Sequence, residues 1–270
     1  MLKLNIDAMG KQVINILWTG GWDSTYRVID LSFKEVVIQP YYLRDNRLSE
    51  AMELSVIRNL TEKIRNRKTN KSELLEVIIV EIEDRKVNFE YSSSYNMLDE
   101  YWKNRSGGKS IGSQYEWLSI FSIDILNLEL GIEKGCKVIT TIKEFGDLEL
   151  VENSEKGSYY QLNKEVSTLD LINIFGAYHF PLLDLSKQDM RNHAKKLGFL
   201  DLMNETWFCH SPRENKACGE CNPCKQTIEA GLTYRFDKKA LDAYKRVKYN
   251  IPVKKSYLSR MAKKIKSLYR

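Results

Sequence analysis

The sequence predicts an α/β protein built on a doubly wound parallel sheet, and two observations carry this prediction. Apolar runs rich in β-forming residues alternate with amphipathic helical patterns, which is typical of parallel strands that helices cover on both faces. The first of these runs leads through a pair of glycines directly into a helical pattern. In such a fold, ligands bind at the carboxyl ends of the strands.

The elements are predicted from hydrophobic spacing and from turn residues. Ser49 is the expected cap of the second helix. Strands are expected at 13–18, 35–43, 74–82 and 136–143, with a short extended piece at 180–185. Helices are expected from Asp23 onward, at 49–67, weakly at 90–105, at 113–133 and at 186–197. The polar stretch 144–163 is expected to be a loop, either a lid over the site or a variable surface segment.

The segment Val13–Val28 is the centre of this organisation. Gly20 and Gly21 can adopt positive φ and leave room for a group that approaches the backbone. Thr19 and Ser24 add hydroxyls, and the start of the next helix offers free N–H groups. The segment therefore predicts a phosphate-binding loop. It is not a Walker A loop, because it lacks Gly-Lys-Ser/Thr, and it lacks the third glycine of a dinucleotide fingerprint. The alternative is an Asp-Ser helix cap after a glycine turn, with no ligand.

Composition limits the class of protein. The chain has 270 residues, enough for one large domain or for one domain with an appendage. No apolar run is long enough to cross a membrane, and the first ten residues lack the features of a signal peptide. We therefore expect a cytoplasmic protein. Its five cysteines are then expected to be free thiols or metal ligands.

Charge is distributed unevenly along the chain. The segment 238–270 holds twelve Lys and Arg against one Asp, and carries +11, whereas the whole chain carries +6. The remaining residues therefore carry −5. Within the basic segment, apolar residues recur at helical spacing among the lysines. They are Tyr257, Leu258, Met261, Ile265, Leu268 and Tyr269. Such a helix either docks on the body or binds a polyanion, a membrane surface or a partner protein.

Four late cysteines have the spacing C-x8-C-x2-C-x2-C. Gly219 and Pro223 favour the tight turns of a metal knuckle. Four thiolates suit Zn²⁺ and leave no position for water, so the site is expected to be structural. An iron–sulfur cluster, His210 as a substitute ligand and unligated thiols are the alternatives. The expected zinc ligands are Cys209, Cys218, Cys221 and Cys224.

Two motifs together resemble a known family. The string Thr19-Gly-Gly-Trp-Asp-Ser24 resembles the Ser-Gly-Gly-x-Asp-Ser signature of the N-type ATP pyrophosphatases, or PP-loop family. With the cysteine cluster about 190 residues later, it is similar to the 7-cyano-7-deazaguanine synthases of the queuosine pathway. The stretches Pro181–Lys187 and Glu205–Cys209 resemble that family in the expected order, and the resemblance spans about 13–232.

The resemblance implies an adenine nucleotide alpha hydrolase-like fold, a homodimer, and use of ATP with Mg²⁺. It also implies a reaction in which a carboxylate, most simply that of 7-carboxy-7-deazaguanine, is adenylated with release of pyrophosphate and amidated by ammonia. The parts would be a PP-loop domain (1–200), a zinc-binding subdomain (201–236) and a basic helical tail (237–270). The implied ATP site is lined by Trp18, Thr19, Gly20, Gly21, Trp22, Asp23, Ser24, Thr25, Tyr26, Arg27 and Val28.

The chain also departs from the family pattern beside the substrate. The family has Pro-Gly-Arg-Asn at the start of the central helix, where this chain has Ile111–Glu116, and an Arg-His pair where this chain has Arg47-Leu48. Two other hypotheses therefore stay open. One is a divergent relative that activates a different acyl group on a protein or a nucleoside. The other is a non-catalytic protein that binds nucleotide or nucleic acid.

Overall fold

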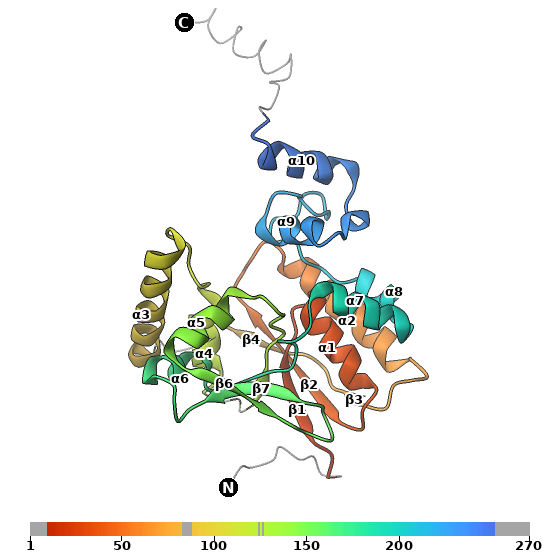
Figure 1. Ribbon diagram of the computed structural model, residues 1–270. Coiled ribbons are helices and arrows are strands. Elements are labelled where there is room, and N and C mark those ends of the chain that lie inside the picture. Colours follow the sequence, from red (N-terminus) through yellow and green to blue (C-terminus); the bar gives the residue numbers. More distant parts are fainter. Residues whose placement is uncertain (1–9, 83–87, 124, 126, 252–270) are drawn as a thin grey trace, which may run out of the picture. The chain divides into compact units, whose positions relative to one another are not determined.

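The computed structural model describes residues 10–82, 88–123, 125 and 127–251 (Figure 1). The chain divides into two compact units, Met1–Phe208 and Cys209–Arg270. The three-part division expected from the sequence stays a prediction.

A mainly parallel sheet organises the first unit. Its strand order is β3-β2-β1-β5-β8-β7-β6, and β4 also pairs with β2. The chain moves outward from β1 to one edge and then returns to the other side of β1 at β5, which confirms the doubly wound α/β fold. Strands β6 and β7 are antiparallel. The strands are β1 (Val13–Leu17), β2 (Val37–Arg44), β3 (Glu73–Leu74), β4 (Ile78–Glu81), β5 (Leu128–Glu129), β6 (Asp147–Val151), β7 (Tyr159–Asn163) and β8 (Tyr178–Phe180).

Helices flank this sheet in two groups (Figure 1). Helices α1, α2, α7 and α8 lie on one side of it and α3 to α6 on the other. Loops that follow β1, β5 and β8 therefore meet at the point where the strand order reverses. The helices are α1 (Trp22–Ser32), α2 (Glu50–Arg65), α3 (Phe89–Ser106), α4 (Gln114–Phe121), α5 (Lys137–Phe145), α6 (Leu169–Phe175), α7 (Lys187–Lys196) and α8 (Leu200–Asn204).

Capping residues explain where several helices begin. Ser186 caps α7 through a capping box with Asp189, at the position that the sequence predicts. Asn88 caps α3 through its side chain. Ser49 holds the cap position of α2 but makes no cap hydrogen bond. Its hydroxyl donates to Glu53 Oε1 instead, at 2.6 Å.

The predicted helix 113–133 is correct only over its first third, and its continuation is wrong. The helix α4 ends at Phe121, and Leu128 and Glu129 form a central strand that pairs with both β1 and β8. Both strand residues are fully buried. A short apolar run that is buried on all sides has no period that separates strand from helix.

The predicted strand 136–143 is also wrong, because this segment is helix α5. Its β-branched residues favour a strand. However, the buried ones are Val138, Thr141 and Ile142, and a spacing of three and four residues is that of a helix. The expected loop 144–163 is instead largely the hairpin of β6 and β7, so it is part of the sheet.

The second unit is small and mostly helical. It contains α9 (Asn222–Glu229), a 3₁₀ turn at Thr233–Arg235 and α10 (Lys238–Lys248). A tight hairpin joins Arg213 to Lys216 through two backbone hydrogen bonds. Across the described residues of both units, no helix is long and apolar enough to cross a membrane.

Candidate phosphate loop and metal centre

The predicted phosphate loop lies between β1 and α1. Gly20 has a φ of +69°, a conformation that glycine adopts without strain. A Cβ at this position would also lie 3.2 Å from the Glu53 carbonyl oxygen. Gly21 has a φ of −75°, so positive φ is not the reason for glycine there. A Cβ on Gly21 would lie 3.3 Å from the Thr19 hydroxyl oxygen.

The first turn of α1 begins on a glycine. Gly21 is its N-cap residue, and no side chain caps the helix. The expected alternative, an Asp-Ser cap, is therefore wrong. The hydroxyl of Ser24 is buried and has no hydrogen-bond partner among the described residues. A helix start on glycine, with a buried hydroxyl that no described residue engages, suits a phosphate group.

Three charged side chains gather beside this turn. Lys187 Nζ lies 3.1 Å from each carboxylate oxygen of Asp23 and also forms a close ion pair with Glu133. Asp23 belongs to α1, Glu133 follows β5, and Lys187 begins α7 after β8. The three groups thus come from the three strand ends that meet at the reversal of the sheet.

The pKa of Asp23 is raised to about 6. Burial is the main cause, Lys187 opposes it, and Glu133 raises the pKa further. Burial opposes the charge of Lys187, but the two carboxylates hold its pKa above the ordinary value. The cluster therefore combines a cation with an acid that titrates near neutrality, next to the helix start. Such perturbed groups are common at functional sites.

Close packing brings the β5 loop against α1. A Cβ on Gly131 would lie 2.9 Å from the Ser24 backbone nitrogen. Any larger residue at 131 would displace the first turn of α1. The sequence reasoning missed Gly131, Glu133 and the role of Lys187. The only signal for them was their position after apolar runs, and it was hidden by the wrong helix at 113–133.

The other residues of the predicted ATP site are packed inside the unit. The Trp18 indole donates to the Thr25 hydroxyl at 2.9 Å, and Val28 is fully buried. Tyr26 forms a close hydrogen bond with His193. Trp22 is almost fully buried. Their contact with a nucleotide stays a prediction.

Arg27 belongs to a buried ionic network. It donates two hydrogen bonds to Glu129, at 2.7 and 3.0 Å. Lys156 Nζ lies 3.1 Å from the same carboxylate and 2.8 Å from His179 Nδ1. Burial disfavours the charge of Glu129, but Arg27 and Lys156 outweigh it and lower the pKa to about 2. Burial, together with Lys156, lowers the pKa of His179 to about 3. Lys156 thus ties the β6–β7 hairpin to the centre of the sheet.

The four late cysteines converge in the second unit, where their sulfur atoms all lie within 4.8 Å of one another. Cys218 and Cys224 have sulfurs 3.9 Å apart, as do Cys209 and Cys221. Four sulfurs around a zinc ion at about 2.3 Å would be separated by about 3.8 Å. The cluster therefore has the size of a tetrahedral zinc site.

Backbone groups support this cluster. The N–H groups of Glu220 and Cys221 both donate to Cys218 Sγ at 3.3 Å, as is suitable for a metal-bound thiolate. Gly219 has a φ of +77°, and a Cβ there would lie 1.9 Å from the Ala240 carbonyl oxygen. Only glycine therefore lets the knuckle pack on the start of α10.

Comparison of the sequence with known protein families agrees with the features of the second unit. The family model described as Queuosine biosynthesis protein QueC matches residues 159–234. This segment includes Lys187, the stretch Glu205–Cys209 and the four cysteines, but not the phosphate loop. No curated protein matches the chain. Over this segment, which is less than a third of the chain, the protein is similar to the QueC family.

Proposed function

We propose that the protein is an ATP-dependent carbon–nitrogen ligase that forms AMP and pyrophosphate. The observation that carries this proposal is the glycine-capped start of α1, where Lys187 contacts Asp23 and the buried hydroxyl of Ser24 has no partner among the described residues. These groups fit a triphosphate, because backbone N–H dipoles and a cation stabilise phosphate charge without reorganisation. The QueC family match supports ATP use in a queuosine-pathway synthase.

The proposed reaction begins when a carboxylate oxygen of the substrate attacks the α-phosphorus of ATP. The bond to pyrophosphate breaks, and an acyl adenylate forms. Ammonia then attacks the acyl carbon, loses a proton and displaces AMP, which leaves a primary amide. A second ATP would adenylate the amide oxygen with release of pyrophosphate, and loss of AMP and of both amide protons would leave a nitrile. The simplest substrate is 7-carboxy-7-deazaguanine, in keeping with the family match.

Mg²⁺ would accompany the nucleotide and neutralise phosphate charge. Asp23 and Glu133 are the acids that lie beside the loop, and both contact Lys187. We propose that they hold the ion once phosphate occupies the loop. Carboxylate oxygens are ligands that Mg²⁺ prefers. Zn²⁺ at the four cysteines would contribute to folding and not to the reaction. By family resemblance we also expect a homodimer, which light scattering would test.

The test is a pyrophosphate-release assay with a panel of acids, beginning with 7-carboxy-7-deazaguanine and ammonium. We expect AMP and pyrophosphate as products, and no turnover by the Asp23→Ala variant although it folds normally. Formation of ADP and phosphate would contradict the proposal.

A second candidate is a divergent relative that activates another acyl group, on a protein or a nucleoside. The region in which the chain departs from the family pattern, at Arg47-Leu48, favours this second candidate. Leu48 is largely exposed, and the neighbouring Arg47 is engaged with Asp45 and Glu53. If the wild-type protein releases pyrophosphate with another acid and not with 7-carboxy-7-deazaguanine, this candidate replaces the first. A non-catalytic binding protein would bind ATP and release no pyrophosphate with any acid.

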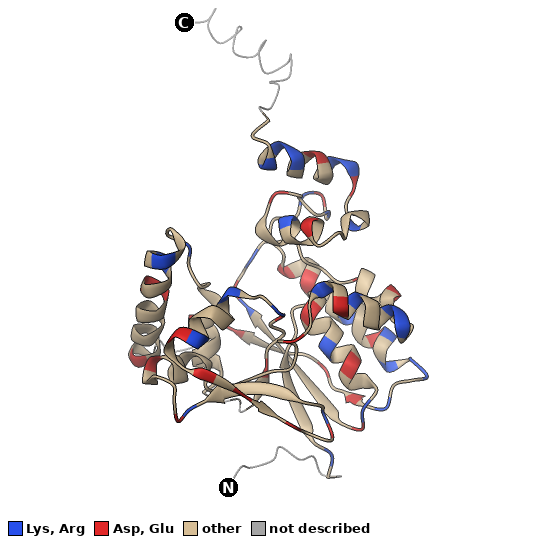
Figure 2. Ribbon diagram, viewed as in Figure 1, with Lys and Arg blue, Asp and Glu red and all other residues tan. Residues whose placement is uncertain are grey.

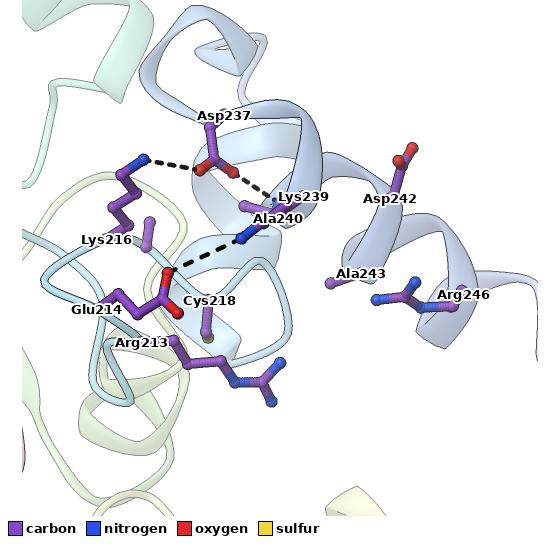
Figure 3. A pocket seen from close by; sticks show the side chains of 11 residues that line it. Arg213, Glu214, Lys216, Cys218, Asp237, Lys239, Ala240, Asp242, Ala243 and Arg246 are labelled. Carbon is purple, nitrogen blue, oxygen red and sulfur yellow. Dashed lines mark hydrogen bonds and ion pairs between the residues drawn. The ribbon is translucent and has the colours of Figure 1, made fainter. Parts of the chain in front are cut away.

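The basic end of the chain suggests a further partner. Lys and Arg cover much of helix α10 (Figure 2), and its exposed bases are Lys238, Lys239, Lys245, Arg246 and Lys248. A pocket of about 320 Å³ in the same unit is lined by bases from the 213–216 hairpin and from α10 (Figure 3). Acids share this pocket, since Lys216 lies 3.6 Å from Asp237. We propose that this unit contributes to binding a polyanion, with the tail at 252–270 as the larger contributor.

A further inference from the structure

The stretch Glu205–Trp207 matches the family motif but has no role in the function proposed above. It follows α8 within the first unit and lies against the phosphate loop. The Trp207 N–H donates to the Gly20 carbonyl oxygen at 2.8 Å. A Cβ on Gly21 would lie 3.7 Å from the Trp207 carbonyl oxygen. The Trp207 backbone therefore runs beside both loop glycines.

The hydrogen bond to the Gly20 carbonyl also fixes the direction of the Gly21 N–H. The Gly20 carbonyl and the Gly21 N–H belong to the same planar trans peptide, in which they point in opposite directions. When the carbonyl is held on Trp207, the Gly21 N–H is directed away from Trp207. Gly21 is the N-cap residue of α1, so this N–H belongs to the predicted anion site.

Helix α2 anchors the stretch and the loop together. The Glu205 carboxylate accepts from Lys63 Nζ at 2.6 and 2.7 Å and from Asn59 Nδ2 at 2.6 Å. The same helix limits the loop, because a Cβ on Gly20 would lie 3.2 Å from the Glu53 carbonyl oxygen. The same helix therefore binds Glu205 and borders Gly20.

The stretch is also held at its own start. Thr206 is buried, and its hydroxyl donates to the Met203 carbonyl oxygen at 2.7 Å. The end of α8 therefore fixes the direction in which Trp207 presents its N–H. The Trp207 ring stacks on Phe208, with the ring planes 21° apart, and plays no part in the bond to Gly20.

We propose that Glu205–Trp207 is a positioning strap for the phosphate loop. Its Trp207 N–H orients the Gly20–Gly21 peptide, so that the Gly21 N–H faces the phosphates of ATP. The strap touches no reacting atom and acts through the loop. This inference rests on the proposed function, because it requires that the loop binds ATP.

The test compares two changes at one position. Trp207→Pro removes the N–H, and Trp207→Ala keeps it while removing the ring. Binding of α,β-methylene-ATP and of adenosine is measured by calorimetry. We expect Trp207→Pro to weaken binding of the ATP analogue about tenfold, as for one lost hydrogen bond. It should weaken binding of adenosine less than twofold. Trp207→Ala should change neither by more than twofold.

A second variant avoids the proline. Glu205→Ala releases the strap from α2 and leaves the Trp207 N–H in place. We expect a loss of affinity of about threefold for the ATP analogue and none for adenosine. The matched control is Glu76→Ala, which removes the ion pair of Glu76 with Arg65 and should leave both affinities unchanged. Circular dichroism checks that each variant folds.

The outcomes separate the strap from the proposed function. Equal binding of the ATP analogue by wild type and Trp207→Pro overturns the strap alone, as does an equal loss for adenosine and the analogue. If Trp207→Pro does not fold, the Glu205→Ala result decides. If the wild-type protein binds no ATP analogue, the proposed function fails and the strap fails with it.

Discussion

Asp23 is held in surroundings that disfavour its charge. Burial, aided by Glu133, raises its pKa to about 6 despite Lys187, whereas an unfolded chain has a value of about 3.9. The folded state therefore takes up a proton that the unfolded state releases, and deprotonation costs stability. This loss of stability is absent below about pH 4 and complete above about pH 6. A residue that is costly to the fold and lies at a helix start is typical of a functional site.

The first prediction follows from this linkage. Asp23→Asn removes the titrating group, so the variant should gain stability relative to wild type as the pH rises from 4 to 7. Urea unfolding at several pH values measures the difference. Asp201→Asn, which alters an exposed acid of α8, is the control and should follow wild type. A constant difference between Asp23→Asn and wild type across this range would contradict the prediction.

The second prediction concerns the buried network. Glu129→Gln leaves Arg27 and Lys156 without their shared anion, so the free energy of unfolding should fall by about 3–5 kcal/mol. Lys156→Met should cost less, because Glu129 keeps both hydrogen bonds from Arg27. Chemical unfolding of both variants measures the order. A larger loss for Lys156→Met would show that Lys156, and not Arg27, compensates the buried carboxylate.

Stability should also depend on pH through His179. Its pKa is about 3 in the folded protein and about 6.5 in an unfolded chain. The folded state therefore binds fewer protons, and stability should fall as the pH drops from about 6.5 toward 3. His179→Gln, which keeps an acceptor for Lys156, should flatten that slope in acid unfolding curves. An unchanged slope would mean that His179 is protonated in the folded state.

At the scale of elements, the sequence predicts those helices and strands whose hydrophobic residues follow a clear period. The strand β1, the helix α2 and the capped helix α7 lie close to where the pattern places them. The strand β5 was missed because it is two residues long and ends in a charged residue. Glu129 is stable there because Arg27, 102 positions earlier, and Lys156 neutralise it, and no local window contains all three residues.

The candidate site likewise has parts that the sequence predicts and parts that only the fold brings together. The glycine loop and the four cysteines are contiguous or closely spaced, so their chemistry is visible in the sequence. The cluster of Asp23, Glu133 and Lys187 joins residues up to 164 positions apart. Only the order of the strands brings them together. The strap at Glu205–Trp207 was visible as a motif, but its backbone bond to Gly20 depends on the fold.

The fourth prediction concerns the cysteine knuckle. Cys221→Ser should release one tightly bound zinc per chain and destabilise the segment from about Trp207 to Leu232, because structural zinc contributes directly to folding. Elemental analysis and hydrogen exchange measure the two effects. Cys136→Ser is the matched control, because Cys136 lies outside the cluster and should leave the metal in place. Iron, or no metal, in the wild-type protein would contradict the prediction.

At the scale of the whole molecule, charge separates the chain into an acidic body and a basic end. The segment 238–270 carries +11 against −5 for the rest. Within the described part of this segment, Lys238, Lys245 and Arg246 form no ion pair, and all three are exposed. The apolar stripe expected at 257–269 lies outside the described residues. Solvated bases of this density attract polyanions in proportion to the number of phosphates that they neutralise.

The last prediction separates recruitment of a polyanion from docking of the tail within the chain. Deletion of Lys254–Arg270 removes seven bases and no acid. Under recruitment, the truncated protein folds normally and loses binding to RNA, DNA, anionic vesicles or a partner protein. That binding should weaken steeply with salt in the full-length chain, because it releases counterions. Under docking, the truncated protein loses stability, and its kinetics stay insensitive to salt. Unfolding curves and binding at two salt concentrations measure both outcomes. If the full-length chain binds none of these partners at low salt, recruitment is wrong and the basic tail serves the fold.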